Sequence, residues 1–158
     1  MKTIAIIGLG YVGLPLALQF SRSGATVIGI DIDPSKVDAL AQGRSYIKHI
    51  TPESIREQLA SGHLSATTDF AAVQRADAVI ICVPTPLNKN REPDISFIVA
   101  TGKALAPHLR PGVLVALESS TYPGTTDEDL RGVLEAGSGL TAGRDFHLAF
   151  SPEDRKSV

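Results

Sequence analysis

The chain has 158 residues, of which 43% are hydrophobic and 20% are charged, and its formal net charge is −2. This length and apolar content are those of one globular domain, so we expect residues 1–158 to fold as a single unit. The weak negative charge and the lack of a dense Lys/Arg cluster exclude nucleic acid and an anionic membrane surface as main partners.

The first predicted elements are a buried strand over residues 3–8 and a glycine-rich turn at its end. The turn contains Gly8, Gly10 and Gly13, and each glycine meets a different need. Gly8 permits a tight turn, Gly10 lets the backbone approach a pyrophosphate group, and Gly13 lets the next helix lie close to the sheet. Because the first amides of that helix lack an intrahelical partner, they and the helix dipole form a seat for phosphates. The spacing therefore predicts a dinucleotide-binding turn.

A helix and a second strand complete this motif. The helix is indicated by apolar residues at helical spacing, namely Val12, Leu16 and Phe20, and Gly24 ends it. The strand over residues 26–31 ends in Asp31, roughly 20 residues past the glycines, where a carboxylate accepts hydrogen bonds from an adenosine ribose. Asp33 follows and no arginine is adjacent. A 2′-phosphate would meet negative charge here, so we expect NAD rather than NADP.

Strands and helices alternate through the rest of the chain, and residues that start or stop a helix lie between them. The later strands are expected at residues 64–67, 78–83, 113–117 and 146–150. The later helices are expected to start at Asp33-Pro34, at Pro52, after the capping residues Asp69 and Asp94, and at Thr125. This alternation is typical of βαβ units. We predict an α/β fold of the Rossmann type: a doubly wound, mainly parallel six-stranded sheet with helices on both faces.

Polar loops leave the carboxyl ends of the predicted strands. They cover residues 8–13, 84–93 and 118–124, and a fourth begins at Ser151. Ligands of open α/β sheets bind along this edge. Pro84 fixes an extended backbone where the fourth strand stops. Pro84 could serve only to end the strand, but at this edge we expect it to form a wall of the nicotinamide site.

Cys82 is the one cysteine of the chain, which excludes an internal disulfide and fits a reducing compartment. It lies in the apolar run 78–83, so we expect a buried packing role and not a nucleophile. The histidines show no spacing typical of a metal site, and we predict no metal; they are His49, His63, His108 and His147. No apolar stretch approaches the roughly 20 residues that span a bilayer, and no signal-peptide pattern follows Met1. We therefore expect a cytoplasmic location.

Five motifs lie at intervals along the chain. They are Gly8-Leu-Gly-Tyr-Val-Gly13-Leu-Pro-Leu-Ala, Asp31 with Lys36-Val, Cys82-Val-Pro-Thr-Pro86, Glu118-Ser-Ser-Thr-Tyr-Pro-Gly-Thr-Thr126 and Phe150-Ser-Pro-Glu153. In order and spacing they resemble the amino-terminal domain of the UDP-glucose/GDP-mannose dehydrogenases. The resemblance covers essentially the whole chain, so it implies that residues 1–158 form an NAD-binding Rossmann domain. Within the family, the segments Ser45–Ile50 and Pro84–Asp94 look most like the UDP-N-acetylglucosamine 6-dehydrogenase branch.

The resemblance implies an NAD-dependent oxidoreductase of polysaccharide biosynthesis. Such an enzyme oxidises the C6 alcohol of a nucleotide sugar to a carboxylate with two NAD per turnover. A cysteine captures the aldehyde from the first hydride transfer, a second transfer gives a thioester, and water releases the acid. The implied substrate is UDP-N-acetylglucosamine, with UDP-glucose, UDP-N-acetylmannosamine and GDP-mannose as alternatives. The implied partner is this UDP-sugar. Family enzymes commonly form a homo-oligomer through a central helix that the 158 residues lack, so a homo-oligomer, a monomer and a non-native association all stay open for this chain.

Residue matching implies roles for individual side chains. Thr121 would hold an ordered water or the substrate oxygen, and Glu153 would assist proton movement or orient the hydrolytic water. The NAD site would be lined by Tyr11, Val12, Asp31, Lys36, Val83, Thr85 and Ser120, beside Gly8, Gly10, Gly13 and Pro84. From the residues alone, Thr121 could be a turn hydroxyl, Glu153 a solvated carboxylate and Lys36 an ordinary surface charge.

Members of the family that the chain resembles are far longer than this chain. Their central helix and second α/β domain supply the nucleophilic cysteine, a catalytic lysine and most contacts to the sugar nucleotide. None of these parts lies in the 158 residues, so we expect the chain alone to bind NAD and not to complete the oxidation. The alternative is a nucleotide-binding module without chemistry of its own, which acts through a partner or as a sensor.

Overall fold

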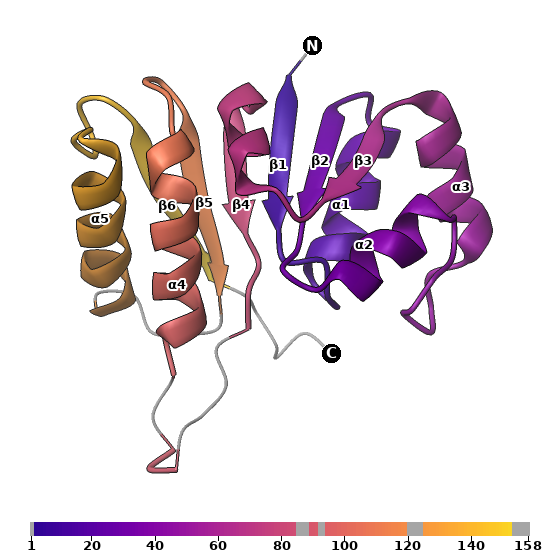
Figure 1. The fold of residues 1–158 in the computed structure, drawn as a ribbon, viewed down its shortest axis with the longest axis horizontal. Helices are drawn as coiled ribbons and strands as arrows, with labels where there is room; N and C mark the ends of the chain where they lie inside the picture. Colours follow the sequence, from indigo (N-terminus) through magenta and orange to yellow (C-terminus); the bar gives the residue numbers. More distant parts are fainter. Residues whose placement is uncertain (1, 85–88, 92–93, 120–124, 153–158) are drawn as a thin grey trace.

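A computed structural model describes residues 2–84, 89–91, 94–119 and 125–152 (Figure 1). Its centre is a six-stranded sheet with the order β3-β2-β1-β4-β5-β6, in which every pair of neighbours is parallel. The strands are β1 (Thr3–Ile7), β2 (Thr26–Ile30), β3 (Leu64–Thr67), β4 (Ala78–Ile81), β5 (Leu114–Ser119) and β6 (His147–Pro152). This is the strand order of dinucleotide-binding Rossmann folds. The predicted fold class is confirmed.

The two faces of the sheet bury separate hydrophobic cores, and β1 contributes to both. Side chains alternate across a strand, so Ile6 and Ile7 point to opposite faces. Ile6 belongs to the core that contains Leu14 and Leu18. Ile7 belongs to the core that contains Leu105. Because both faces of β1 are covered, its apolar run is continuous rather than alternating.

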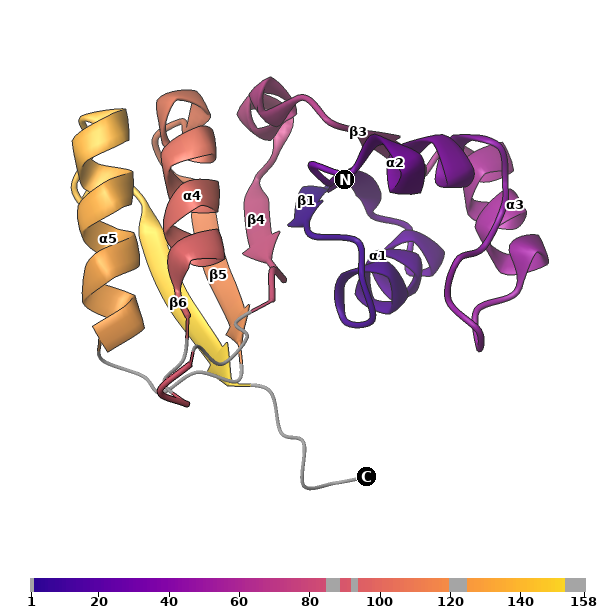
Figure 2. The ribbon, with the colours of Figure 1, turned by 60° about the horizontal axis from the view of Figure 1, so that its bottom comes forward.

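Helices cover these two faces. Among the described residues they are α1 (Gly13–Arg22), α2 (Pro34–Ala41), α3 (Pro52–Ser61), α4 (Ser96–Leu105) and α5 (Thr125–Ser138), with the 3₁₀ turns η1 (Phe70–Arg75) and η2 (Ala106–His108). Figures 1 and 2 show α4 and α5 side by side against β5 and β6, while α1, α2 and α3 gather around β1, β2 and β3. In the part of the chain described above, no helix has the length and apolarity needed to cross a bilayer.

Local capping signals set where several helices begin. Asp33, Asp69 and Asp94 each accept a hydrogen bond at 2.9 Å from the backbone N–H two residues further on. Asp33 and Asp69 are the N-caps of their helices, as expected from the sequence. Asp94 lies one residue earlier than expected, because the N-cap of α4 is Ile95. Thr51, which the sequence analysis did not name, caps α3 by accepting from the Ser54 N–H at 3.2 Å. The short helix after Asp69 is a 3₁₀ turn rather than an α-helix.

The buried stripe of α1 differs from the predicted one. Its fully buried side chains include Leu14, Ala17 and Leu18, which follow the i, i+3, i+4 spacing of a helix face. The residues that predicted the helix are only half-buried; they are Val12, Leu16 and Phe20. Leu16 and Phe20 pack at the margin of the same core. The helix was thus predicted correctly from residues that flank its most buried face.

Cys82 lies just beyond β4, because that strand ends at Ile81 rather than at residue 83. The Cys82 N–H still donates to the Ile7 carbonyl at 2.7 Å, so the backbone continues alongside β1. Its side chain packs against the core of α1 but is half-buried rather than buried. Cys82 is only half-buried because it lines the cleft at the carboxyl edge of the sheet.

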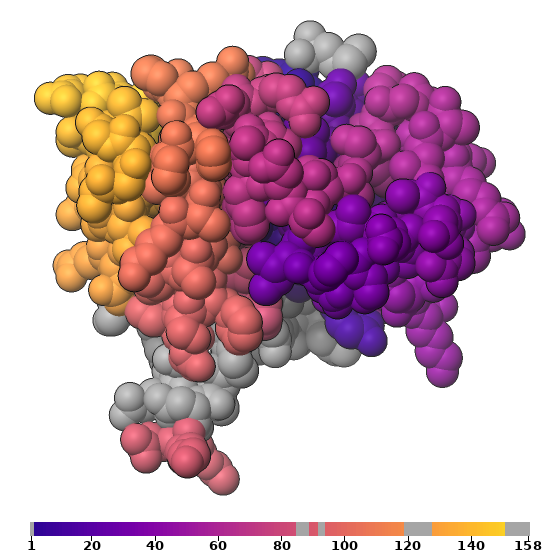
Figure 3. Space-filling view, viewed as in Figure 1, coloured from indigo at the N-terminus to yellow at the C-terminus, as the bar shows by residue number. Residues whose placement is uncertain are grey.

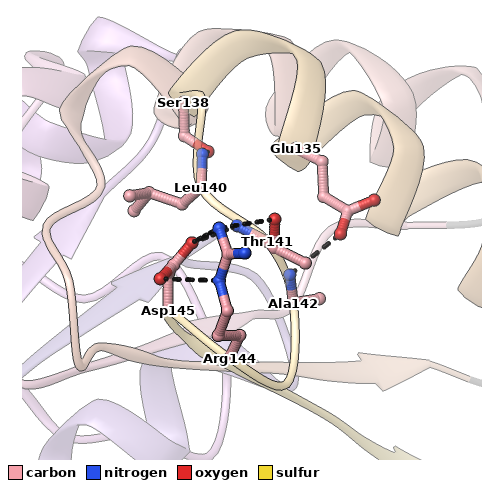
Figure 4. A network of polar contacts seen from close by, with 7 residues as sticks. All are labelled: Glu135, Ser138, Leu140, Thr141, Ala142, Arg144 and Asp145. Atoms are coloured by element: carbon pink, nitrogen blue, oxygen red, sulfur yellow. Dashed lines mark hydrogen bonds and ion pairs between the residues drawn. The ribbon is translucent and has the colours of Figure 1, made fainter.

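Polar contacts hold the connection between α5 and β6 (Figure 4). The Asp145 carboxylate accepts from the Thr141 N–H at 2.8 Å and pairs with the Arg144 guanidinium at 3.0 Å. The Glu135 carboxylate accepts from the Ala142 N–H at 2.9 Å. The Arg144 side chain, followed by the Thr141 N–H, holds the pKa of Asp145 below its usual value. The network anchors the turn that leads into β6.

Candidate functional site

A cleft of about 530 Å³ lies at the carboxyl edge of the sheet, beside β1 and β4. The strand order reverses between these two strands, and open α/β sheets bind ligands at such a point. Its walls come from the glycine-rich turn, the end of β2, the residues after β4, and α4; they include Gly8, Gly10, Tyr11, Val12, Asp31, Lys36, Val83, Pro84, Phe97 and Thr101. Figure 3 shows the face of the molecule that carries α2 in purple and α4 in orange.

The three glycines of the turn have different surroundings. Gly8 has φ +95°, and a Cβ there would lie 2.8 Å from the Cys82 carbonyl oxygen. A Cβ on Gly13 would lie 1.7 Å from the Gly8 carbonyl oxygen, so no side chain fits. A Cβ on Gly10 would meet nothing within 4 Å, and Gly10 lines the cleft. Gly8 and Gly13 are therefore needed to fold the turn, whereas Gly10 leaves its backbone open to a ligand.

The first N–H groups of α1 are not capped by a side chain, unlike those of α2 and α3. The N-cap residue of α1, Val12, makes no side-chain capping hydrogen bond. The Leu14 N–H, which donates to the Gly10 carbonyl at 3.1 Å, begins the helical pattern. In contrast, Asp33 and Thr51 cap α2 and α3 with their own oxygens. The amides that precede the first helical hydrogen bond are the donors that bind phosphate groups at helix starts.

Asp31 has two roles in this geometry. It is 8% exposed. Its Oδ2 accepts from the Leu9 N–H at 2.8 Å, and its Oδ1 accepts from the Asp33 N–H at 2.9 Å. Each carboxylate oxygen has a second acceptor site, so a ribose hydroxyl can still donate to it. The sequence predicted the ribose contact but not the bond to Leu9, which ties the glycine-rich turn to the end of β2.

Asp33 and Lys36 line this side of the cleft, and Tyr46 contacts Lys36 without lining the cleft itself. The Ser35 hydroxyl and then the Ser35 N–H donate to Asp33 and hold the pKa of its carboxyl below the usual value. Lys36 is half-buried and lines the cleft. Its ammonium lies 5.9 Å from the centre of the Tyr46 ring. The structure therefore places Lys36 inside the cleft and not on the outer surface of α2.

The opposite wall contains residues that the sequence analysis missed. Phe97 and Thr101, one helical turn apart on α4, line the cleft together with Phe70 of η1. Phe97 is 43% exposed, and Ile32, which directly follows Asp31 on the other side of the cleft, is 71% exposed. Large apolar side chains this exposed, at the rim of a cleft, offer surfaces on which ring systems can pack. The spacing of four residues on a helix after a carboxyl-edge loop was the signal that could have found Phe97 and Thr101.

Glu118, to which the sequence analysis gave no role, also lines the cleft and is half-buried. Four predicted site residues lie outside the described part of the chain; they are Thr85, Ser120, Thr121 and Glu153. The other predicted cofactor residues lie around one cleft except Gly13, which does not line it; those that do are Gly8, Gly10, Tyr11, Val12, Asp31, Lys36, Val83 and Pro84.

Residues 2–157 match the UDP-glucose/GDP-mannose dehydrogenase family, NAD binding domain. The chain belongs to this family. The UDP-N-acetyl-D-glucosamine 6-dehydrogenase of Pseudomonas aeruginosa is 37% identical to it over 150 residues, which make up 95% of this chain and 35% of that protein. The UDP-N-acetyl-D-mannosamine dehydrogenase of Pyrococcus horikoshii is 38% identical over 153 residues, 95% of this chain and 36% of that protein.

Solved structures of the family have the same fold. A ternary complex of GDP-mannose dehydrogenase from Pseudomonas aeruginosa matches with a TM-score of 0.91 and 35% identity, over 98% of this chain and 36% of that one. A structure of UDP-D-ManNAc dehydrogenase from Pyrococcus horikoshii matches with a TM-score of 0.89. The chain spans about a third of the length of these relatives.

The family match confirms NAD as the cofactor of this domain, and the cleft fits that molecule. The uncapped start of α1 and the open backbone at Gly10 suit a diphosphate. The buried Asp31 carboxylate keeps acceptor sites for a ribose diol. The exposed side chains of Ile32 and Phe97 give apolar surface for a ring.

Proposed function

We propose that residues 1–158 form the cofactor-binding domain of a nucleotide-sugar 6-dehydrogenase. The observation that carries this proposal is the open start of α1, which faces a cleft at the strand reversal and has the Asp31 carboxylate beside it. The family match supports it. When bound, NAD accepts a hydride from the substrate carbon.

Within this proposal, the residues around the cleft divide the dinucleotide between them. Asp31 holds the adenosine ribose, and Lys36 lies beside it. The N–H groups of residues 10–13 hold the diphosphate. Val83 and Pro84 form the wall next to the nicotinamide and keep water away from that side. Thr85 and Ser120 complete the same region, as the motif resemblance implies.

Two further residues act at the reacting end of the site. We assign Thr121 the binding of an ordered water or the substrate oxygen, and Glu153 the movement of a proton or the orientation of the hydrolytic water. Both assignments depend on the motifs Glu118–Thr126 and Phe150–Glu153. The 158 residues alone bind the cofactor without completing the oxidation, because the resemblance assigns the nucleophilic cysteine and the catalytic lysine to parts of the relatives that these residues do not match.

The proposed substrate is UDP-N-acetylglucosamine. The segments Ser45–Ile50 and Pro84–Asp94 support this choice by resemblance, and a relative named for that activity is 37% identical. A relative named for UDP-N-acetylmannosamine is 38% identical, so the test must compare the two sugars. The gene's complete product should be assayed for NADH formation with UDP-N-acetylglucosamine, UDP-N-acetylmannosamine, UDP-glucose and GDP-mannose. A higher kcat/KM for any of the last three would overturn the choice.

Calorimetric titration of the 158-residue chain tests the cofactor site directly. NAD⁺ should bind at least tenfold more tightly than NADP⁺, because Asp31 and Asp33 repel a 2′-phosphate. Lys36→Ala should weaken NAD⁺ binding severalfold. The matched control is Lys103→Ala, an exposed lysine near the end of α4 that does not line the cleft, and its affinity should equal that of the wild type. Preference for NADP⁺, or equal effects of both lysine substitutions, would contradict the assigned site.

A further inference from the structure

The segment Ser45–Ile50, between α2 and α3, packs against the glycine-rich turn. Ile47 anchors it: its side chain is 3% exposed in the core of α1. The Ser45 hydroxyl donates to the Ile47 carbonyl at 2.9 Å, and the Ile50 N–H donates to the same carbonyl at 3.0 Å. The segment is therefore held by its own hydrogen bonds and by the core. Two of its side chains face the turn: the His49 ring lies 6.4 Å from the Tyr11 ring, and Tyr46 forms a hydrogen bond.

The Tyr46 hydroxyl donates to the Leu9 carbonyl at 2.5 Å. Leu9 lies between the first two glycines of the turn, and its N–H donates to Asp31 at 2.8 Å. Both peptide groups of Leu9 are thus held by side chains from elsewhere in the chain. A peptide group is planar, and its carbonyl and N–H point in opposite directions. By holding the Leu9 carbonyl, Tyr46 sets the direction of the Gly10 N–H.

Tyr46 also contacts a second residue of the cleft. The Lys36 ammonium lies 5.9 Å from the centre of its ring, within the range of a cation–π interaction. Burial, followed by the charges of Asp31 and Asp33, raises the pKa of Tyr46 well above its usual value. The hydroxyl therefore keeps its proton and remains a donor to Leu9. One side chain thus supports both the turn and the lysine.

We propose that Tyr46 is a positioning residue for the dinucleotide. Its hydroxyl orients the Gly10 amide toward the diphosphate, and its ring holds the Lys36 ammonium by a cation–π contact. This inference rests on the proposed cofactor site, since it acts through the turn and Lys36. Tyr46 does not line the cleft itself. The hydroxyl acts through the Leu9 carbonyl and the Gly10 amide, so its loss should weaken the binding of the phosphates and not that of the adenine and its ribose.

The test compares Tyr46→Phe with the wild-type chain. The variant keeps the ring, and with it the support of Lys36, but loses the hydroxyl. The matched control is Ser138→Ala, which removes a part-buried hydroxyl that donates to the Leu134 carbonyl at 2.6 Å, far from the cleft in α5. Dissociation constants for NAD⁺, ADP and adenosine should be measured by calorimetry or by ligand-observed NMR. Urea unfolding of each variant gives its stability.

Tyr46→Phe should bind NAD⁺ and ADP about 3- to 10-fold more weakly, which corresponds to the loss of one hydrogen bond. Its affinity for adenosine should equal that of the wild type, and Ser138→Ala should bind all three ligands normally. In the wild type, the NMR signal of the Gly10 amide should shift strongly on addition of ADP, and it should shift less in Tyr46→Phe. Replacing Tyr46 by 4-aminophenylalanine, which restores a donor, should restore ADP binding.

Three results would overturn the inference. Unchanged NAD⁺ and ADP affinity in Tyr46→Phe would show that the hydroxyl does not act on the site. Equal weakening of adenosine and ADP would indicate a general structural effect, as would failure of the amino variant to restore ADP binding. If the wild-type chain itself does not bind NAD⁺, the proposed function fails first. If the wild type binds NAD⁺ and Tyr46→Phe binds it equally well, only the role of Tyr46 is rejected.

Discussion

Replacing Asp31 by asparagine should destabilise the chain, because the side chain would lose one of its two acceptors. The Leu9 and Asp33 N–H groups donate to different oxygens of Asp31, at 2.8 and 2.9 Å. A carboxamide offers one acceptor and one NH₂ donor. One of the two N–H groups would therefore face a donor in a site where the side chain is 8% exposed.

The expected cost follows from the bonds involved. A hydrogen bond to a charged group contributes about 1.5–3 kcal/mol, and the remaining bond would become neutral and weaker. We expect the free energy of unfolding to fall by about 2–3 kcal/mol. For a chain of this length, that change lowers the melting temperature by about 5–10 °C. Urea unfolding followed by circular dichroism measures the first quantity, and calorimetry measures the second.

Asp69→Asn is the matched control for this experiment. Asp69 is exposed and caps η1 through one N–H, that of Ala71 at 2.9 Å. Asparagine caps helices about as well as aspartate, so this variant should change the free energy of unfolding by less than about 0.5 kcal/mol. If Asp31→Asn were no more destabilising than the control, the two hydrogen bonds would not be what ties the turn to β2.

Three further experiments test the turn and the surface. Gly13→Ala should destabilise the chain by about 3 kcal/mol or prevent folding, since its Cβ would lie 1.7 Å from a carbonyl oxygen; Gly132→Ala, in α5 with nothing within 4 Å of the added Cβ, should instead stabilise it by about 0.5–1 kcal/mol in urea unfolding. Gly10→Ala should leave the free energy of unfolding within about 0.5 kcal/mol of wild type, because the added Cβ meets no protein atom within 4 Å. It should weaken NAD⁺ binding in calorimetry, because the Cβ occupies the cleft where the cofactor approaches the backbone. Normal NAD⁺ binding would refute this close approach at Gly10. The pKa of Asp145 is lowered in the folded chain, first by Arg144, so its stabilising effect is present above the carboxyl's ordinary pKa and is lost as pH falls below it. Melting temperatures measured from pH 5 downward should therefore fall less steeply in Asp145→Asn than in wild type, and parallel curves would contradict the assignment.

Much of the fold could be predicted from local patterns along the chain. The continuous apolar run of β1 reflects burial on both faces, and the alternation of strands and helices indicated a parallel sheet. Capping residues such as Asp33 and Asp69 located helix starts, because a cap depends on atoms only two or three residues away. The boundaries were less exact: β4 ends at Ile81 rather than at residue 83, although Cys82 still bonds to β1.

The candidate site was predicted only in part, for a related reason. Gly8 and Gly13 could be identified from spacing, since the turn that requires them is short. Phe97 and Thr101 could not, because they reach the cleft from α4, and only the packing of that helix against the sheet brings them there.

The sequence by itself determined the glycine-rich turn, the acidic end of β2 and the order of the elements, because each depends on neighbours along the chain or on a simple period. Only the tertiary structure decided what holds the turn in place. Leu9 is separated by 22 residues from Asp31 and by 37 from Tyr46, yet it bonds to both. Such contacts follow from how β2 and the segment after α2 pack against β1, and no local pattern records that packing.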